Sequence, residues 1–389
     1  MNSFRMKKNI LLAALLCLSG VSFAQTYEMT VTTKGGVQYT VPASDVISVE
    51  FEQAAETLGP IPSGIDLSAV FAMSTTQEML KTYKHVNILL SEGNYTLSKD
   101  IEVPNDVRFG IKGQGAGATI TLGDATLIVG NAFTLENVHF NASNSSKPLV
   151  TLSSTPNEEL KGATGSGNYY NIMKPFVIRN CDVKGLSNVI ISDNGTAYCL
   201  GVVQVDNCLF ELTSENVGGI ALVDMRNGGI NDLTISNSTV YQKGPGDVKY
   251  LIQYSNNYRC DRGGYERNSV NILNSTFYNV CKEGQFANYS GFAGRNTSDW
   301  QMKKSLFVNV SGGETARRFL GSRSNQATAV FDHNCYWYNG ADENYDGYDT
   351  SGNVISGDPL FEDAEGGDFT PTASEHVSNQ IGDPRWYAE

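Results

Sequence analysis

Short stretches in which apolar and polar residues alternate run through most of the chain, and this alternation is typical of half-buried β-strands. The first such stretch, residues 27 to 51, alternates on both sides of Gly35-Gly36. It predicts a β-hairpin followed by a third strand at Val46 to Phe51. We therefore expect a small β unit over residues 25 to 52 and a linker over residues 53 to 64.

A different spacing follows Asp66. Apolar residues recur there at partly helical intervals as far as Tyr83, and Asp66 is a suitable N-cap because its short side chain can accept a hydrogen bond from the first turn. We expect one or two short helices over residues 66 to 85, which would cap the first layer of the domain that follows.

From Val86 onward, short strands are interrupted by Gly and Asn, and an internal repeat orders them. Each copy consists of an apolar alternation, then Asn, then a β-branched or aromatic residue. The copies centre on Asn137, Asn180, Asn207, Asn237, Asn274, Lys304 and Asn334. The last five centres are separated by 30, 37, 30 and 30 residues.

A period near thirty that holds only strands and turns predicts a parallel β-helix, in which each coil stacks on the one before. Asn suits the corner of a coil because it tolerates left-handed backbone geometry, and stacked amides can hydrogen-bond along the column. A β-propeller would need antiparallel hairpins in every repeat, and these repeats show none. We expect an all-β domain over residues 65 to 389, a single-stranded right-handed parallel β-helix whose last coil is covered by the tail after Phe361.

Composition agrees with turns, strands and aromatic packing, because 39 Gly and 35 Asn accompany 19 Tyr and 17 Phe. The first 24 residues have a separate role. Three basic residues precede an apolar run from Ile10 to Leu18, and a small-residue site ends at Ala24 before Gln25, which is the pattern of a secretory signal peptide. We expect cleavage near Ala24-Gln25 and a secreted protein, periplasmic or at the cell surface.

Charge excludes one class of partner. Removing residues 1 to 24 deletes three basic residues and no acidic one, which changes the net charge from −13 to −16. A chain this acidic repels nucleic acid phosphates, so nucleic acid is not an expected partner. No later segment is apolar for long enough to cross a membrane. We expect a monomer.

Six cysteines follow the predicted signal peptide, and none of them forms a CxxC pair. With only four His in the whole chain, a zinc site is not expected. Export permits disulfides, but a domain of this size does not need them. We favour small buried thiols and leave disulfides as the alternative.

The sequence resembles the pectate-lyase-like right-handed β-helix proteins, especially secreted Bacteroidetes members classed as domains of unknown function. The resemblance covers residues 66 to 389. It is carried by the opening segment VNILLSEGNYTLSKDIEVPNDVRFGIKGQGAGATITL, the Asn-centred coils, and the ending GDPLFEDAEGGDFTPTASEHVSNQIGDPRW. It implies an extracellular or periplasmic protein concerned with acidic polysaccharides. It does not imply catalysis, because function must be argued from the site.

A candidate sugar-binding face lies about 14 residues after each Asn turn. Stacking the segments that begin at residues 189, 221, 251, 286 and 319 brings Tyr, Arg, Asn and Asp side chains together, and these suit a sugar polymer through ring stacking and hydrogen bonds. The candidates, including those in adjoining loops, are Asp193, Asp224, Arg226, Tyr254, Asn256, Tyr258, Arg259, Asp261, Arg262, Arg267, Tyr289, Arg295 and Arg323. An error of one residue in the alternation would bury half of them. The alternative interpretation is an ordinary solvated face.

Two further motifs have weaker meanings. Asp342, Asn344 and Asp346 match the first half of a calcium-binding loop, but Asn353 stands where the closing carboxylate belongs. A calcium site is one hypothesis and an acidic surface turn the other. The glycines of residues 113 to 117 are not followed by a helix, so they predict a β-helix turn and no phosphate site.

Three functions stay open at this point. The first is a polyuronate lyase acting by β-elimination, or a hydrolase; a lyase needs a base beside a group that neutralises the substrate carboxylate. The sequence contains neither the arginine motif of pectate lyases nor the carboxylate pattern of polygalacturonases, so no complete catalytic motif is present. The second function is a non-catalytic glycan-binding protein of a polysaccharide-utilisation system. The third is a structural or adhesive surface rod.

Overall fold

The computed structural model describes residues 28–32, 38–42, 54–162, 169–213, 220–255, 258, 260, 264–265, 267–288, 297–320 and 327–387. The chain divides into two compact units, Met1–Ala54 and Ala55–Glu389. In the first unit, β1 (Glu28–Thr32) pairs with β2 (Gln38–Pro42) in antiparallel register, with Thr30 opposite Thr40. The predicted hairpin is therefore confirmed. The third strand expected at Val46 to Phe51 lies outside the described residues.

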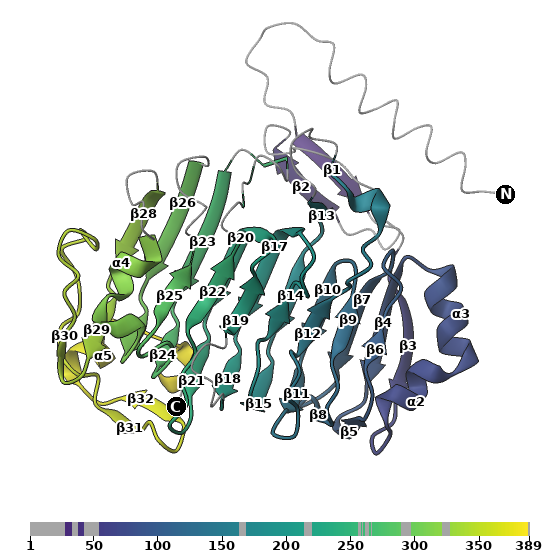
Figure 1. Ribbon diagram of the computed structural model, residues 1–389, viewed down its shortest axis with the longest axis horizontal. Helices are drawn as coiled ribbons and strands as arrows, with labels where there is room; N and C mark the ends of the chain where they lie inside the picture. The colour runs from purple at the N-terminus through teal and green to yellow at the C-terminus, as the bar shows by residue number, and fades with distance from the viewer. Residues whose placement is uncertain are drawn as a thin grey trace, which may run out of the picture. The chain divides into compact units, whose positions relative to one another are not determined.

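The larger unit consists of three parallel sheets that wind around one core (Figure 1). The first sheet contains, in spatial order, β3 (Glu56–Ile61), β4 (His85–Leu90), β7 (Arg108–Gly113), β10 (Phe133–Glu136), β14 (Phe176–Arg179), β17 (Tyr198–Asp206), β20 (Gly229–Ser236), β23 (Arg267–Leu273), β26 (Thr297–Lys303) and β28 (Ala327–Asp332), with β13 (Tyr170–Ile172) beside β17.

The second sheet contains β5 (Gly93–Leu97), β8 (Ala118–Leu122), β11 (Val138–Asn141), β15 (Asp182–Leu186), β18 (Leu209–Leu212), β21 (Thr239–Gln242), β24 (Thr276–Tyr278), β27 (Leu306–Val308), β29 (Cys335–Tyr338) and β30 (Ala341–Asp342), of which β30 pairs antiparallel to β29. The third sheet contains β6 (Ile101–Glu102), β9 (Leu127–Val129), β12 (Val150–Leu152), β16 (Ile191–Ser192), β19 (Ile220–Met225), β22 (Tyr250–Tyr254) and β25 (Gln285–Asn288). Successive strands of the chain enter the three sheets in turn, which is the predicted parallel β-helix.

Columns of like residues fill the interior. In the first sheet, Ile111, Leu135, Ile178 and Val205 occupy one register position on successive coils, and each is almost fully buried. Aromatic rings form similar columns: Phe307 stacks between Phe277 and Tyr336, with ring centroids 5.2 and 5.6 Å away. Repeating one residue type at one register position thus builds a continuous core from short strands.

The Asn residues of the repeat turn the chain from the first sheet into the second. Asn137, Asn180, Asn207, Asn237 and Asn274 all have φ between 45° and 56°, which is the left-handed region that Asn tolerates. The predicted amide contacts occur between neighbouring coils, because the side chain of Asn207 donates to the Asn180 oxygen (2.8 Å) and that of Asn274 to the Asn237 oxygen (3.4 Å).

The last repeat was placed one residue too far along. Cys335 pairs with Leu306, so His333, with φ 47°, takes the turn position and Asn334 lies inside it, opposite Ser305. Asn334 is fully buried, where its oxygen accepts from the Ser305 backbone N–H (3.2 Å) and its amide donates to the Met302 carbonyl (2.8 Å). Its role is to satisfy buried backbone groups, as the Ser hydroxyls do in preceding coils.

Helices α2 (Leu67–Ala72) and α3 (Ser74–Thr82) confirm the predicted cap. The Asp66 side chain accepts from Ser68 N (2.9 Å), and the Phe71 ring packs edge-on against Phe109 at 5.4 Å. The prediction of a linker over residues 53 to 64 was wrong. These residues contain β3, which pairs in parallel with β4 and completes the open edge of the first sheet.

The tail after Phe361 was expected over the last coil, and this was also wrong. Strands β31 (Phe361–Asp363) and β32 (Asp368–Pro371), helix α5 (Ser374–Asn379) and η6 (Pro384–Tyr387) lie beside the second sheet instead. Phe369 packs against Tyr241 (5.0 Å) and Tyr278 (5.3 Å), because these outward aromatic rings need an apolar cover. The last coil is covered in part by Tyr345, whose ring lies 5.7 Å from Tyr336.

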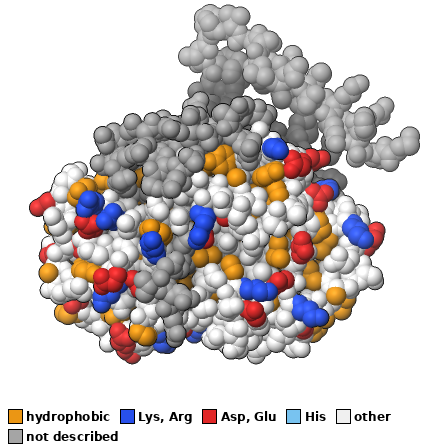
Figure 2. Space-filling view, viewed as in Figure 1, with side chains coloured by type: hydrophobic (Ala, Val, Ile, Leu, Met, Phe, Trp, Pro, Cys, Tyr) orange, Lys and Arg blue, Asp and Glu red, His pale blue; other side chains and the backbone are white. Residues whose placement is uncertain are grey.

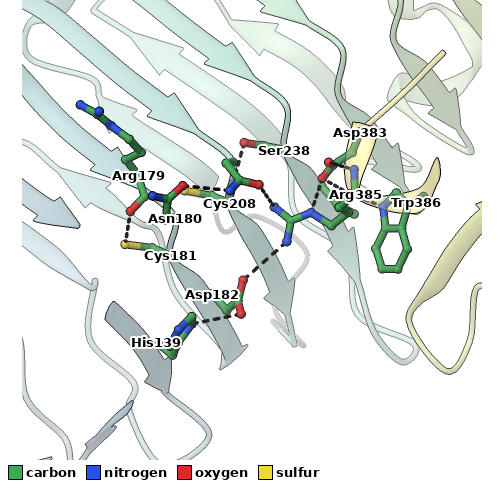
Figure 3. A network of polar contacts seen from close by, with 12 residues as sticks. His139, Arg179, Asn180, Cys181, Asp182, Cys208, Ser238, Asp383, Arg385 and Trp386 are labelled. Atoms are coloured by element: carbon green, nitrogen blue, oxygen red, sulfur yellow. Dashed lines mark hydrogen bonds and ion pairs between the residues drawn. The ribbon is translucent and has the colours of Figure 1, made fainter. Parts of the chain in front are cut away.

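Polar contacts fix the end of this tail (Figure 3). Asp383 is buried and accepts from Arg385 Nε (2.7 Å) and from the Thr239 hydroxyl (2.8 Å). Arg385 also reaches Asp182 Oδ1 at 3.6 Å, and the other oxygen of Asp182 lies 3.1 Å from His139 Nδ1. The charge of the buried carboxylate is therefore compensated by an arginine two residues away.

Other predictions about the core hold. All six cysteines of the larger unit are buried, and none of them forms a disulfide. The glycines of residues 113 to 117 form a turn between β7 and β8, in which the Asn137 amide donates to the carbonyls of Gly113 (3.1 Å) and Gly115 (3.2 Å). Within the described ranges, no helix has the length and apolar character needed to cross a membrane.

Candidate functional site

One column of polar residues faces outward along the third sheet. Ser192 pairs with Asp224, Asp224 with Gln253, and Gln253 with Asn288. Arg226 forms a bidentate ion pair with Asp224, with Nε–Oδ1 2.9 Å and Nη2–Oδ2 2.7 Å, and is itself more than half exposed. Asp224 and Arg226, predicted as site residues, are thus brought together on this face.

Asp193, Tyr254 and Tyr258 were predicted as exposed sugar contacts, and all three are buried. Tyr254 pairs with Met225, one position beyond the outward column, so the predicted alternation was displaced by one residue. Asp193 accepts from Asn227 N (2.7 Å) and Gly195 N (3.0 Å), and burial raises the pKa of its carboxyl. These hydrogen bonds hold the turn after β16 and leave the side chain no access to a ligand.

Tyr258 packs inside a cluster of aromatic rings. Its centroid lies 5.7 Å from that of Tyr254 and 5.9 Å from that of Tyr169. A Cβ at Gly229 would meet its ring at 2.6 Å, so only glycine fits beneath it. The aromatic excess in this part of the chain therefore builds core.

The other predicted residues do not join this face. Arg267 begins β23 of the first sheet. The segment expected to form a strand from residue 319 begins in a helix instead, because Phe319 and Leu320 end α4 (Thr315–Leu320) and are buried against the core. Asn256, Arg259, Asp261, Arg262, Tyr289, Arg295 and Arg323 lie outside the described residues.

A shallow pocket of about 300 Å³ opens at the start of β22 and β25, on the same sheet. Tyr250 and Gln285 pair in register and form its floor, and Lys249 and Glu283 stand beside them. Lys249 Nζ lies 5.3 Å from the Tyr250 ring centroid, a cation–π distance. The opposite side is lined by Ser311, Gly312, Glu314 and Arg318.

Helix α4 forms that opposite side and is held from two directions. Phe319 packs against Phe286 of β25, with ring centroids 6.2 Å apart. The buried Glu343 carboxylate accepts from the Thr315 backbone N–H (2.8 Å) and hydroxyl (3.0 Å), and burial raises the pKa of Glu343 to about 7. Because these contacts are buried, the position of α4 is fixed, and Arg318 lines the pocket from this helix.

The charges in the pocket are mostly paired. Glu314 accepts from Arg318 Nε at 2.9 Å and also contacts Arg317. Lys249 has no carboxylate partner among the residues that the structure describes. Figure 2 shows acidic and basic side chains interspersed on the visible side of the molecule. The pocket therefore combines an aromatic ring, an amide, an available ammonium group and two carboxylates, the groups that bind sugars and move protons.

Sequence reasoning missed Lys249, Tyr250, Gln285 and Arg318. The sequence contains one indication of this pocket, a Lys-Tyr pair at the start of the strand that begins at residue 250. The contribution of Arg318 depends on a helix that replaces an expected strand, so no periodic pattern could have assigned it to this pocket.

The predicted calcium loop is held together by its own backbone. Asp342 Oδ1 accepts from Gly357 N (2.7 Å), and the Asn344 side chain accepts from Asp346 N (3.3 Å). Among the described residues, no group of three or more His, Cys, Asp and Glu side chains could hold a metal ion. A calcium site at Asp342, Asn344 and Asp346 stays a prediction.

The fold and this face define the class of protein: a parallel β-helix with a column of polar residues facing outward on one sheet. The chain matches two family models, each described as a domain of unknown function, DUF4957 over residues 93–243 and DUF5123 over residues 233–386. These matches agree with the expected class.

Two further comparisons complete this picture. No curated protein matches the sequence. A solved structure described as that of the PL6 family alginate lyase AlyGC is 14% identical, with a TM-score of 0.37; the match covers 82% of this chain and 46% of that chain. The chain thus spans about half the length of that protein.

Proposed function

We propose that the protein acts on an acidic polysaccharide, and that the pocket beside Tyr250 is where a sugar unit binds. The observation that supports this most directly is Lys249, an ammonium group without a carboxylate partner among the described residues, placed over an aromatic ring beside Glu283. A uronate offers a carboxylate to the lysine and a sugar ring to the tyrosine.

The proposed reaction is β-elimination. A base removes the proton next to the uronate carboxylate, the bond to the leaving oxygen breaks, a carbon–carbon double bond forms, and the leaving oxygen takes up a proton. Glu283, which lines the pocket beside Lys249, is the candidate base. Lys249 is the candidate partner of the substrate carboxylate, because Arg318 across the pocket is already paired with Glu314. The similarity to an alginate lyase is compatible with this chemistry, and the pocket residues are the basis of the proposal.

The alternative is a non-catalytic glycan-binding protein. The outward column on the third sheet favours it, because Ser192, Gln253 and Asn288 offer hydrogen bonds without acid or base chemistry. A structural rod is the third possibility. For all three, the proposed location is the periplasm or the outside of the cell. The predicted signal peptide supports this proposal, and fractionation of cells that produce the full chain tests it.

A panel of acidic polysaccharides tests the main proposal. The protein is incubated with each polymer, with and without calcium, and the absorbance of unsaturated products is followed. A rise in absorbance with one polymer supports a lyase. Retention in affinity electrophoresis without product supports a binding protein. No product and no retention with any polymer would contradict both.

A further inference from the structure

Among the residues that the structure describes, the third sheet ends at β25, while the first and second sheets continue for further coils. In the coil that contains β26 and β27, the chain forms η4 (Ser311–Gly313) and α4 where the next strand of the third sheet would stand. Figure 1 shows α4 beside β25 at this end of the sheet. The polar outward column therefore meets a helix at one end.

This helix closes the pocket on one side. Ser311, Gly312, Glu314 and Arg318 line it from η4 and α4, and Lys249, Tyr250, Glu283, Gly284 and Gln285 line it from β22, β25 and the residues just before them. The closing side is anchored in the core through Phe319 and Thr315, whose contacts with Phe286 and Glu343 are buried. A wall with such anchors does not move aside at low cost to let a polymer continue past it.

We propose that this pocket binds the terminal unit of an acidic glycan chain, so that the protein recognises chain ends and not chain interiors; this rests on the proposed function. The Lys249 ammonium contacts the carboxylate of the terminal unit, and Tyr250 stacks on its ring. Arg318, held by Glu314, stands across the pocket. The rest of the chain leaves across the third sheet over Asn288, Gln253 and Asp224, which follow one another at the inter-strand spacing of about 4.8 Å.

Chain length separates end recognition from interior recognition. Acidic oligosaccharides and polymers of one composition are prepared in graded lengths, and their binding to the full protein is measured by titration calorimetry. End recognition predicts a dissociation constant that is independent of length when expressed per chain. Interior recognition predicts one that is independent of length when expressed per sugar unit, and this result would overturn the inference.

The size of the products is the second test of end recognition. If the protein cleaves, end recognition predicts one short product from the earliest time, with little change in the length of the parent polymer. A broad distribution of early products would overturn the inference while leaving the proposed function intact. No binding and no product with any acidic glycan would remove the proposed function and the inference with it.

Variants assign the effect to the pocket. Lys249→Ala is expected to weaken binding of short chains by about tenfold or more, because a charge-assisted hydrogen bond is lost. Lys99→Ala, which removes another lysine at the opposite end of the β-helix, is the matched control and should leave binding unchanged. Equal binding by Lys249→Ala and the parent protein at every length would place the chain end elsewhere and contradict the inference.

Discussion

His139 Nδ1 lies 3.1 Å from Asp182 Oδ2, across two neighbouring coils of the second sheet. The other Asp182 oxygen lies 3.6 Å from Arg385, so one carboxylate joins the β-helix to its C-terminal tail (Figure 3). The adjacent Asp182 carboxylate raises the pKa of His139 above its usual value, and His139 in turn helps to lower the pKa of Asp182.

This pair predicts a pH dependence of stability. A histidine whose pKa is raised on folding stabilises the protein fully below the pKa of the unfolded chain, near 6.5, and this stabilisation is lost as pH rises through the higher folded value. Urea unfolding of the parent protein and His139→Gln should differ more at pH 6 than at pH 9. The same difference in unfolding free energy at both pH values would contradict the assignment.

Arg385→Ala should loosen the tail. It removes a partner of the buried Asp383 carboxylate, although the Thr239 hydroxyl and the backbone still donate to it. We expect a loss of about 2 to 4 kcal/mol in the free energy of unfolding. Arg179→Ala removes an exposed arginine of the same region and should change stability by less than about 0.5 kcal/mol. Equal losses in the two variants would mean that Arg385 does not anchor the tail.

The corrected last turn makes opposite predictions for two adjacent residues. Asn334→Ala should cost about 2 to 3 kcal/mol, because buried backbone groups of Ser305 and Met302 lose their partner. His333→Asn should change stability by less than about 1 kcal/mol, because Asn adopts the left-handed conformation of that position readily. Thermal unfolding of both variants distinguishes this register from the one in which Asn334 is the turn residue.

Two tyrosines that look alike in the sequence should respond differently. Tyr258→Ala should cost about 3 to 5 kcal/mol, because a fully buried ring leaves a cavity. Tyr250→Ala should leave stability within about 1 kcal/mol and weaken retention on acidic polysaccharides, because its ring is only partly buried in the pocket floor. A stable Tyr258→Ala protein with weakened retention would restore the interpretation of Tyr258 as a sugar contact.

The repeat predicted the fold because every coil obeys the same local rules. Asn207 and Asn237 fall at the same left-handed corner for the same reason, so one pattern, found several times, fixes the architecture. The pattern failed where the chemistry of a single position changed. His333 occupies the turn position although it is not Asn, and Asn334 next to it satisfies buried backbone groups. An alignment based on the Asn residue type therefore placed this coil one residue out of register.

The site was harder to predict, because an outward face depends on alternation that a single residue can shift. Asp224 and Arg226 were found, since their column does point outward, whereas Asp193 and Tyr254 fell one position into the core. Arg318 could not be found from the repeat, because α4 interrupts it. The pocket forms where helix α4 takes the place of a strand of the repeat.

The central claim is that Lys249 and its neighbours act on an acidic glycan. The most direct measurement compares the parent protein, Lys249→Ala and Lys99→Ala on the panel of acidic polysaccharides, following unsaturated products and retention together. The account predicts product or retention for the parent protein and Lys99→Ala with at least one polymer, and a loss of about tenfold or more for Lys249→Ala. Full activity or retention in Lys249→Ala, or none in the parent protein with any polymer, would contradict it.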